Sequence, residues 1–469
     1  MRSGSRSFKV GLIIVQIAVY VALTLLSRQF VFGQDHLQRP IALFLLLYFA
    51  AWASFLPASI AVLRTPEIYS VRLVLTVAFL LRLLLLPSNL IQESDVYRYV
   101  LDGQALLHRQ NPYQYPARTV EELAEGSFGQ ALLEPEAQIV LARVSYPDIP
   151  TVYPPVAQFA FAAGAMLGGW NWMGQRLIFL LLDLLAIFLL LKLLSLFNKP
   201  PVLILLYAWN PLVLKEIINS SHYDVLILVF LALLLISFHR DQERPGSWWI
   251  VPAALSLSGS ILSKLYPILL LPACTTYLKR KAGERKAFLF VILVLATCIV
   301  GFLPFYSVGW EALTKGLREF SGNWLRNAGF FGLLEFVLPY PRAVLTLLLL
   351  ILATGVPFVN RVQNLERFIT SLLWILLIWF LIIPMPYPWY AVPLCGLAIL
   401  GTSQNVLVTT LVLSGSFGLY YAGFWIEYRN LPSSWETVIR FVEHGAVWVT
   451  MLLMWWRGLT GVAELSMSR

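Results

Sequence analysis

The feature that most limits how this chain can fold is a series of long apolar runs that recur from Phe8 to Trp456. Most of these runs are roughly 15–25 residues long, close to the ~20 residues that a helix needs to cross a membrane. They are too long for the alternating strands, about 10 residues each, of an outer-membrane barrel. The chain is 59% hydrophobic and 13% charged, against about 45–50% and about 25% in soluble domains. The sequence therefore predicts an all-α polytopic integral membrane protein.

The net charge of +9 does not indicate a nucleic-acid partner. The lysines and arginines lie mostly in short loops between apolar runs, where they act as orientation signals and form no continuous basic face. The three cysteines, Cys274, Cys298 and Cys395, fall inside or beside apolar runs and show neither disulfide nor metal-site spacing. The first run, 8–32, is longer than a signal-peptide core, so we expect it to be retained as a helix.

Loop charges predict the topology. Arg2, Arg6 and Lys9 precede the first run and place the N-terminus in the cytoplasm. We expect the segment 154–169 to lie beside the membrane without crossing it, because this keeps the basic loop 279–286 cytoplasmic. The result is a bundle of about 12–14 transmembrane helices with both chain ends in the cytoplasm. The predicted spans are 8–32, 41–63, 71–91, 176–196, 201–218, 223–238, 248–262, 266–278, 287–306, 342–359, 368–383, 389–401, 406–426 and 436–456.

Three segments organise the predicted bundle. Residues 1–70 form an N-terminal helix pair, 71–306 form the main membrane module, and 307–469 form a later external loop and the C-terminal helices. The module contains a long first extracytoplasmic loop, 92–175, with room for juxtamembrane helices. The runs 248–262 and 266–278 are short and are predicted to be half-helices that meet near Lys264. Broken helices occur at membrane depth only where the exposed backbone lines a cavity or packs in protein.

The most informative stretch of the external loop is QESDVYRYVLDGQALLHRQNPYQYP, residues 92–116, which directly follows the third apolar run. On extended backbone, Glu93 and Asp95 would point to the same face. Two carboxylates so close raise the pKa of one of them, suit a proton acceptor, or share a cation. The structural alternative is that Ser94 or Asp95 caps the helix that follows. The two interpretations are compatible.

Further polar residues are predicted on the same external side. Each of these residues also has a structural explanation. A scattered set of solvated loop charges would lie on the same side. In that interpretation Lys264 snorkels from a helix end, and His222 is an ordinary hydrogen-bonded turn histidine. The cluster 387–390 is typical of an interfacial anchor more than of a sugar platform, and Arg82 inside the third run has no predicted role. The candidate substrate-binding residues are Arg98, Asp102, Asn111, Tyr113, Tyr153, Lys215, Glu216, His222, Asp224, Lys264, Arg318 and Arg326.

The motifs ESDVYRYVLDG…QNPYQYP, DIPTVYPPVAQ, WNPLVLKEIINSSHYD and SKLYPILLLP resemble those of the polyprenyl-phosphate-mannose-dependent mannosyltransferases of GT-C architecture. Bacterial alpha-mannosyltransferases and the catalytic subunit of the first GPI mannosyltransferase are the members of this family that we name for comparison. The resemblance covers about 71–278 well and the C-terminal helices loosely. The acidic pair is ExD here, whereas several relatives have DxD, so which carboxylate acts as the base stays open.

The resemblance implies a GT-C-type helical bundle and an inverting transfer of a hexose from a polyprenyl-phosphate sugar to a glycan or glycolipid acceptor. Only the resemblance favours mannose. It implies Asp95 as general base, with Glu93 orienting it or serving instead, and Lys264, Arg326 and Arg318 as phosphate contacts. His222 and Asp224 would bind sugar hydroxyls or the acceptor. The expected location is a bacterial inner membrane with an extracytoplasmic active site.

The sequence requires no cofactor, although a divalent cation near Glu93, Asp95 and Asp224 is chemically compatible. Other functions remain open. A transporter or flippase of lipid-linked sugars would also show basic and aromatic residues and broken helices, but it would not need paired carboxylates and would usually contain a repeat. A polymerase or ligase of lipid-linked glycans is expected to carry its large external loop later in the chain.

Overall fold

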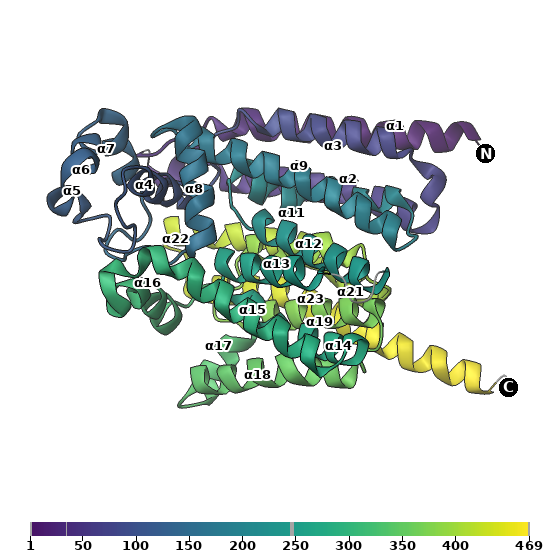
Figure 1. The fold of residues 1–469 in the computed structure, drawn as a ribbon. Coiled ribbons are helices and arrows are strands. Elements are labelled where there is room, and N and C mark those ends of the chain that lie inside the picture. Colours follow the sequence, from purple (N-terminus) through teal and green to yellow (C-terminus); the bar gives the residue numbers. More distant parts are fainter. Residues whose placement is uncertain (1, 34, 244–247, 468–469) are drawn as a thin grey trace.

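The computed structural model describes residues 2–33, 35–243 and 248–467, and for 2–7 and 457–467 it describes the backbone alone. The chain is helical throughout these ranges, with no strand in any of them. Most long helices run side by side along one axis, with both chain termini at one end of the molecule and α4–α7 at the other (Figure 1). We call these the terminal end and the capped end.

The first part of the chain builds one side of the bundle and the cap. Its elements are α1 (Arg2–Ser27), η1 (His36–Gln38), α2 (Ile41–Arg64), η2 (Pro66–Ile68), α3 (Val71–Leu85), α4 (Asp95–Leu107), α5 (Val120–Leu123), α6 (Gly126–Leu132), α7 (Pro135–Leu141), α8 (Pro155–Gly168), α9 (Met173–Leu196), η3 (Pro201–Ile204), α10 (Leu205–Ala208), α11 (Pro211–Val213), η4 (Leu214–Asn219) and α12 (Val225–Glu243).

The remainder completes the bundle. Its elements are α13 (Ile250–Ser263), η5 (Tyr266–Leu270), α14 (Leu271–Ala282), α15 (Glu284–Phe302), η6 (Leu303–Val308), α16 (Gly309–Asn323), α17 (Phe330–Val337), α18 (Pro341–Val359), α19 (Leu365–Ile382), η7 (Pro388–Ala391), α20 (Val392–Ala398), α21 (Gln404–Ser416), η8 (Phe417–Tyr421), α22 (Ala422–Tyr428) and α23 (Ser433–Met467).

Within the described ranges, nine helices are long and apolar enough to cross a membrane, which supports the predicted membrane-embedded, all-helical class. They are Phe8–Ser27, His36–Arg64, Met173–Leu196, Val225–Glu243, Glu284–Asn323, Pro341–Val359, Leu365–Ile382, Gln404–Tyr428 and Ser433–Trp456.

A tenth candidate is the pair Pro201–Ala208 and Pro211–Asn219, which is bent by 53°. The prediction of 12–14 spans exceeds this number because the runs 71–91, 248–262, 266–278 and 389–401 form shorter helices. The 15 residues of α3 extend only about 22 Å at 1.5 Å per residue, less than the ~30 Å hydrocarbon core.

Proline and asparagine account for the bend in the predicted run 201–218. Asn210 precedes Pro211 in extended backbone, and its side chain accepts a hydrogen bond from the Leu212 amide at 3.0 Å. The chain then continues through η4, a π-helical turn. A second break separates α13 from η5, where Lys264 is extended. This is the junction at which the sequence predicts that two half-helices meet.

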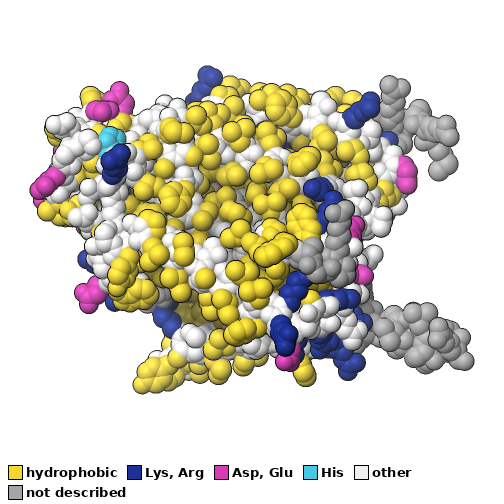
Figure 2. Space-filling view, in the orientation of Figure 1, with side chains coloured by type: hydrophobic (Ala, Val, Ile, Leu, Met, Phe, Trp, Pro, Cys, Tyr) yellow, Lys and Arg dark blue, Asp and Glu magenta, His cyan; other side chains and the backbone are white. Residues whose placement is uncertain are grey.

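The predicted juxtamembrane segment 154–169 forms α8, which crosses the end of the bundle near α4 (Figure 1). The two helices pack closely at Gly103, where an added Cβ would lie 2.4 Å from the Phe161 carbonyl oxygen. Figure 2 shows a face that is apolar across its middle, with acidic side chains at the capped end and lysines and arginines near α14 and α15. This distribution is typical of a membrane protein.

A single hydrophobic core includes residues of all three predicted segments, from Val19 to Val447. Arg82, for which the sequence predicts no role, is fully buried in it, with Nε 2.5 Å from the Asp183 carboxylate. Tyr207 donates a hydrogen bond to the same carboxylate at 2.7 Å. This network joins α3, α9 and α10. Arg82 therefore faces protein, not lipid.

Candidate active site

A cavity of about 560 Å³ extends into the bundle and is lined in part by residues 92–95, which we call the acid loop. Glu93, Asp95 and Lys264 lie in its polar part. The lining also includes Leu345 and Thr346 of α18, and Thr346 is exposed on the helix surface. The cavity thus brings ionisable groups and apolar side chains into one space.

Glu93 and Asp95 stand at the start of α4. Gln92, just before them, has a φ of 62°, so the chain turns sharply out of the preceding segment. Ser94 occupies the N-cap position, but its side chain makes no capping bond and instead lies 2.5 Å from the Ser145 hydroxyl. The predicted capping role is therefore not filled by Ser94. Asp95 lies in the first turn of α4, where the helix dipole favours a negative charge.

The two carboxyl groups have different environments. Burial raises the pKa of Glu93 well above its usual range, with the charge of Lys215 opposing the rise and that of Asp95 adding to it. Burial also raises the pKa of Asp95, to about 6, with the charge of Lys264 opposing it. Both side chains are partly exposed to the cavity, yet both lie far enough inside the protein to lose most hydration. Burial therefore disfavours the ionised form of both carboxyl groups.

Lys264 faces the cavity from the break between α13 and η5. Its Nζ atom lies 2.7 Å from Asp224 Oδ1, and its ammonium lies 3.8 Å from the centre of the Tyr390 ring. Asp224 is fully buried behind it and does not line the cavity. An ion pair and a cation–π contact therefore hold the lysine at the cavity wall.

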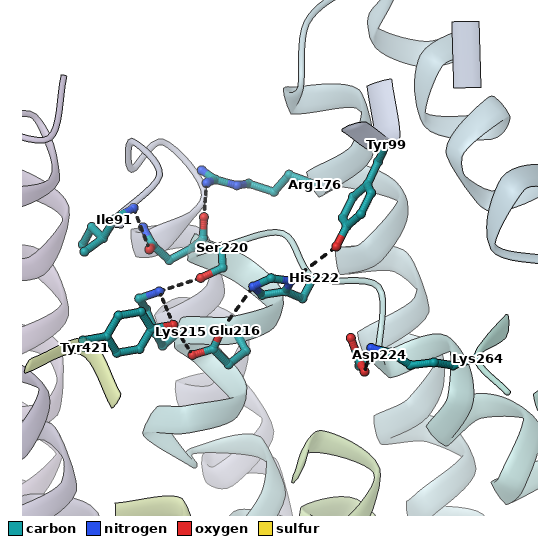
Figure 3. Close-up of polar contacts among 11 residues, drawn as sticks. Ile91, Tyr99, Arg176, Lys215, Glu216, Ser220, His222, Asp224, Lys264 and Tyr421 are labelled. Atoms are coloured by element: carbon teal, nitrogen blue, oxygen red, sulfur yellow. Dashed lines mark hydrogen bonds and ion pairs between the residues drawn. The ribbon is translucent and has the colours of Figure 1, made fainter. Parts of the chain in front are cut away.

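Lys215, Glu216 and His222 form a buried network behind the cavity (Figure 3). Lys215 donates to Tyr421 at 3.0 Å, and Tyr421 donates to Glu216 at 2.6 Å. His222 Nε2 lies 3.5 Å from the Glu216 carboxylate, and His222 Nδ1 lies 3.4 Å from the Tyr99 hydroxyl. None of the three predicted residues lines the cavity.

The His222 ring nevertheless contacts the cavity wall through an aromatic stack. It lies parallel to Trp389 at 3.8 Å, and Trp389 lies parallel to Tyr387 at 4.6 Å. Trp389 and Tyr387 line the cavity and are nearly buried. The sequence analysis favours an interfacial anchor for the cluster 387–390, but these rings form an inner wall of the cavity. Further aromatic residues of the lining are Tyr266, Trp379, Tyr390 and Tyr420.

Arg176 and Asn219 support the site but are not among the predicted site residues. Arg176 is fully buried and donates to the carbonyl oxygens of Leu86, Ser88 and Asn219. The Asn219 side chain accepts from the Ile91 amide at 3.2 Å and donates to the Asn89 carbonyl oxygen at 2.8 Å. Together they fix the turn that leads to Glu93. The sequence signal for this arrangement is an arginine, Arg176, at the start of a long apolar run.

Three other predicted residues support the cap without lining the cavity. Asp102 is buried and accepts hydrogen bonds from Thr151 and Gln158. Asn111 donates to the Phe305 carbonyl oxygen at 2.8 Å, and Tyr113 donates to the Tyr153 carbonyl oxygen at 2.6 Å. These bonds tie the external loop to η6 and to the segment before α8.

Tyr153, Arg98 and Arg326 line the cavity, as does Arg342, which sequence reasoning missed. Arg326 pairs with Glu427 at 3.2 Å. Arg342 donates to the carbonyl oxygens of Ser321 and Trp324 and stands one turn before Leu345. Arg318 is exposed, bonds the Glu311 carbonyl oxygen and does not reach the cavity.

A larger cavity, about 1200 Å³, lies around α14 and α15 toward the terminal end. Two of its lysines have partners, since Lys286 lies 2.5 Å from Asp241 and Lys199 donates to the Gly401 carbonyl oxygen at 2.5 Å, and neither Glu93 nor Asp95 lines it. We therefore place the candidate active site in the smaller cavity.

No protein-family model, curated protein or solved structure matches the chain. In the described part of the chain, no three His, Cys, Asp or Glu side chains are grouped so that they could hold a metal ion. The sequence is compatible with a divalent cation near Glu93, Asp95 and Asp224. Of these three, Glu93 and Asp95 line the cavity, whereas Asp224 does not line it and is paired with Lys264. We derive no metal-dependent step.

Proposed function

We propose that the protein is a membrane glycosyltransferase that moves a hexose from a polyprenyl-phosphate sugar to an extracytoplasmic glycan or glycolipid acceptor. The observation that carries the proposal is the composition of one cavity. Glu93, Asp95 and Lys264 line it together with Leu345 and Leu349 of α18. Such a space suits a ligand with an anionic head and a long apolar tail.

The proposed chemistry uses Asp95 as general base. Its carboxylate takes the proton of the acceptor hydroxyl while that oxygen forms a bond to the anomeric carbon. The bond from this carbon to the phosphate oxygen breaks, and its electron pair leaves with the polyprenyl phosphate. The configuration at the carbon inverts. A lipid phosphate leaves already ionised, so the reaction needs no strong general acid, unlike glycoside hydrolysis.

Glu93 has a different role in this proposal. Burial and the charge of Asp95 raise the pKa of Glu93 well above its usual range, which favours the protonated form. A protonated carboxyl group can donate a hydrogen bond, whereas an ionised one only accepts. Glu93 therefore orients Asp95 or the acceptor hydroxyl and does not compete for the proton.

The departing phosphate needs positive charge in a water-poor site. Lys264 and Arg326 line the cavity but already pair with Asp224 and Glu427. Arg342 has carbonyl partners, and the described residues supply it with no carboxylate partner. Arg342 also lines the cavity next to the apolar side chain of Leu345. We assign Arg342 as the main contact of the donor phosphate and Lys264 as a second one.

The test is transfer by the purified protein in lipid nanodiscs. Radiolabelled polyprenyl-phosphate mannose and polyprenyl-phosphate glucose are supplied with a membrane glycolipid extract, and labelled glycolipid is measured. Asp95→Asn should lower the rate at least about 100-fold, the usual contribution of a general base. Asp148→Asn is the matched control, because Asp148 is an exposed loop carboxylate outside the cavity.

Two results would contradict the proposal. One is the absence of transfer by the wild type from either donor. The other is undiminished transfer by both Asp95→Asn and Glu93→Gln, with both variants eluting as folded, monodisperse protein.

A further inference from the structure

We propose that Tyr146 and Trp324 form a platform at the cavity that binds a pyranose ring of the acceptor. This inference rests on the proposed function and adds the acceptor subsite to it. The two residues come from loops almost 180 positions apart in sequence, 142–154 and 324–329. Both line the cavity, and their ring centres lie 4.0 Å apart with an angle of 37° between the planes.

The backbone of Tyr146 indicates that the position is functional. Its φ is 52°, a left-handed conformation that glycine and asparagine adopt readily and a bulky aromatic residue rarely does. Strain of this kind collects at ligand-binding sites. The Tyr146 side chain is 55% exposed, so burial of its ring does not offset that strain. Contact with a ligand would.

Each platform residue is held by an arginine of the cavity wall. Arg98 donates to the carbonyl oxygens of Tyr146 and Ile149 at 3.1 and 3.0 Å. On the opposite side, Arg342 donates to the Trp324 carbonyl oxygen at 3.2 Å. The two loops are therefore fixed, and the rings do not depend on their own contact to stay in place.

The platform is also tied directly to the catalytic pair. The Ser145 hydroxyl lies 2.5 Å from that of Ser94, so the residues next to Tyr146 and Asp95 are in contact. A ring resting on the platform would thus have its hydroxyls near the proposed base. The chemistry fits a pyranose, which has an apolar C–H face for an aromatic ring and hydroxyls around its edge. Phe320, which also lines the cavity, is in edge contact with Trp324 at 4.7 Å.

Interfacial aromatic residues often anchor a protein to lipid headgroups, and this is the competing explanation. An anchor would face the bilayer. Tyr146 and Trp324 instead pack against each other at the wall of a cavity that two carboxyl groups also line. Exposed aromatic residues without such a partner exist on this chain, notably Trp310 and Tyr340, and neither lines the cavity. They provide matched controls.

The experiment measures steady-state transfer from polyprenyl-phosphate mannose to octyl α-mannopyranoside, used below its micelle concentration. Tyr146→Asn removes the ring but keeps a residue that tolerates the left-handed backbone. Tyr146→Phe keeps the ring, and Trp324→Leu removes the second ring. We expect Tyr146→Asn and Trp324→Leu to raise the KM for the acceptor about tenfold or more, and Tyr146→Phe to change it less than threefold. The KM for the donor should stay within a factor of two in all three.

The controls Trp310→Leu and Tyr340→Asn should leave both KM values unchanged. If acceptor KM is also unchanged in Tyr146→Asn and Trp324→Leu, the platform is wrong although the proposed function stands. If the wild type transfers no sugar, the proposed function fails, and saturation-transfer NMR with octyl α-mannopyranoside decides the platform separately. Loss of the NMR signal in Trp324→Leu supports it, and an equal signal overturns it. Should Tyr146→Asn not fold, Trp324→Leu supplies the same comparison.

Discussion

Lys264 Nζ lies 2.7 Å from Asp224 Oδ1, and this ion pair joins the break after α13 to the start of α12 at the wall of the cavity. The carboxylate is fully buried, whereas the lysine side chain is 15% exposed, toward the cavity. The pair is therefore part of the structure and, in the proposed function, part of the site. Substitutions can separate these two contributions.

Asp224→Asn should destabilise the protein by about 3–5 kcal/mol, because it leaves the Lys264 ammonium without its carboxylate partner. The double variant Lys264→Met with Asp224→Asn should recover most of the lost stability, since a well-packed neutral pair replaces the ions. Thermal unfolding in detergent measures both. The double variant should still transfer sugar poorly, because the cation at the cavity wall is gone. Full transfer activity in the double variant would show that Lys264 has no role in the reaction.

The pH dependence of transfer should follow Asp95. Burial raises the pKa of this carboxyl group to about 6, and a general base must be deprotonated to act. The value of kcat/KM should therefore be level above about pH 7 and fall about tenfold per unit below pH 6. Asp102 also has a pKa raised by burial to about 6, so Asp102→Asn is the necessary control. It should keep the acid limb. If kcat/KM of Asp102→Asn no longer falls below pH 6, the pH dependence belongs to Asp102 instead of Asp95.

Arg342→Gln should raise the KM for the polyprenyl-phosphate donor about 10–100-fold, the range of a charge-assisted hydrogen bond of about 1.5–3 kcal/mol. Inhibition by free polyprenyl phosphate should weaken by a similar factor, because the product carries the same phosphate. Arg342→Lys keeps the charge and should recover part of the loss. Arg326→Gln should have the smaller effect, since Arg326 already pairs with Glu427. If Arg326→Gln raises the donor KM more than Arg342→Gln does, Arg326 is the main phosphate contact instead.

Arg176→Lys should lower kcat about tenfold or more with little change in either KM, because a small displacement of catalytic groups is expensive in rate. Lysine keeps the charge but cannot reach the carbonyl oxygens of Leu86, Ser88 and Asn219 together. Arg82→Lys is the matched control, since Arg82 is equally buried but pairs with Asp183 away from the acid loop. Rates are compared per folded molecule after gel filtration. Equal losses of kcat in the two variants would mean that Arg176 has only a structural role.

The sequence and the structure agree best where local physics decides. Long apolar runs have to form helices in a membrane, since every backbone N–H and C=O needs an internal partner there. The break at Lys264 was likewise predictable from two short apolar runs, whereas the position of α8 beside the membrane stays a prediction. The location of Glu93 and Asp95 at the start of α4 follows from the abrupt end of the third apolar run.

What only the tertiary structure decided is which polar side chains reach the cavity. Lys215, Glu216 and His222 precede Asp224 closely in sequence, yet the π-helical turn η4 directs them into a buried network behind the wall. Arg176 bonds to backbone oxygens up to 90 positions away, and Arg342 and Trp324 come to line the same cavity as Glu93 and Asp95 only after folding. Backbone oxygens have no signature in a sequence, and the direction of a side chain depends on packing between distant helices. Composition therefore determined the helical membrane fold, and long-range packing determined the candidate site.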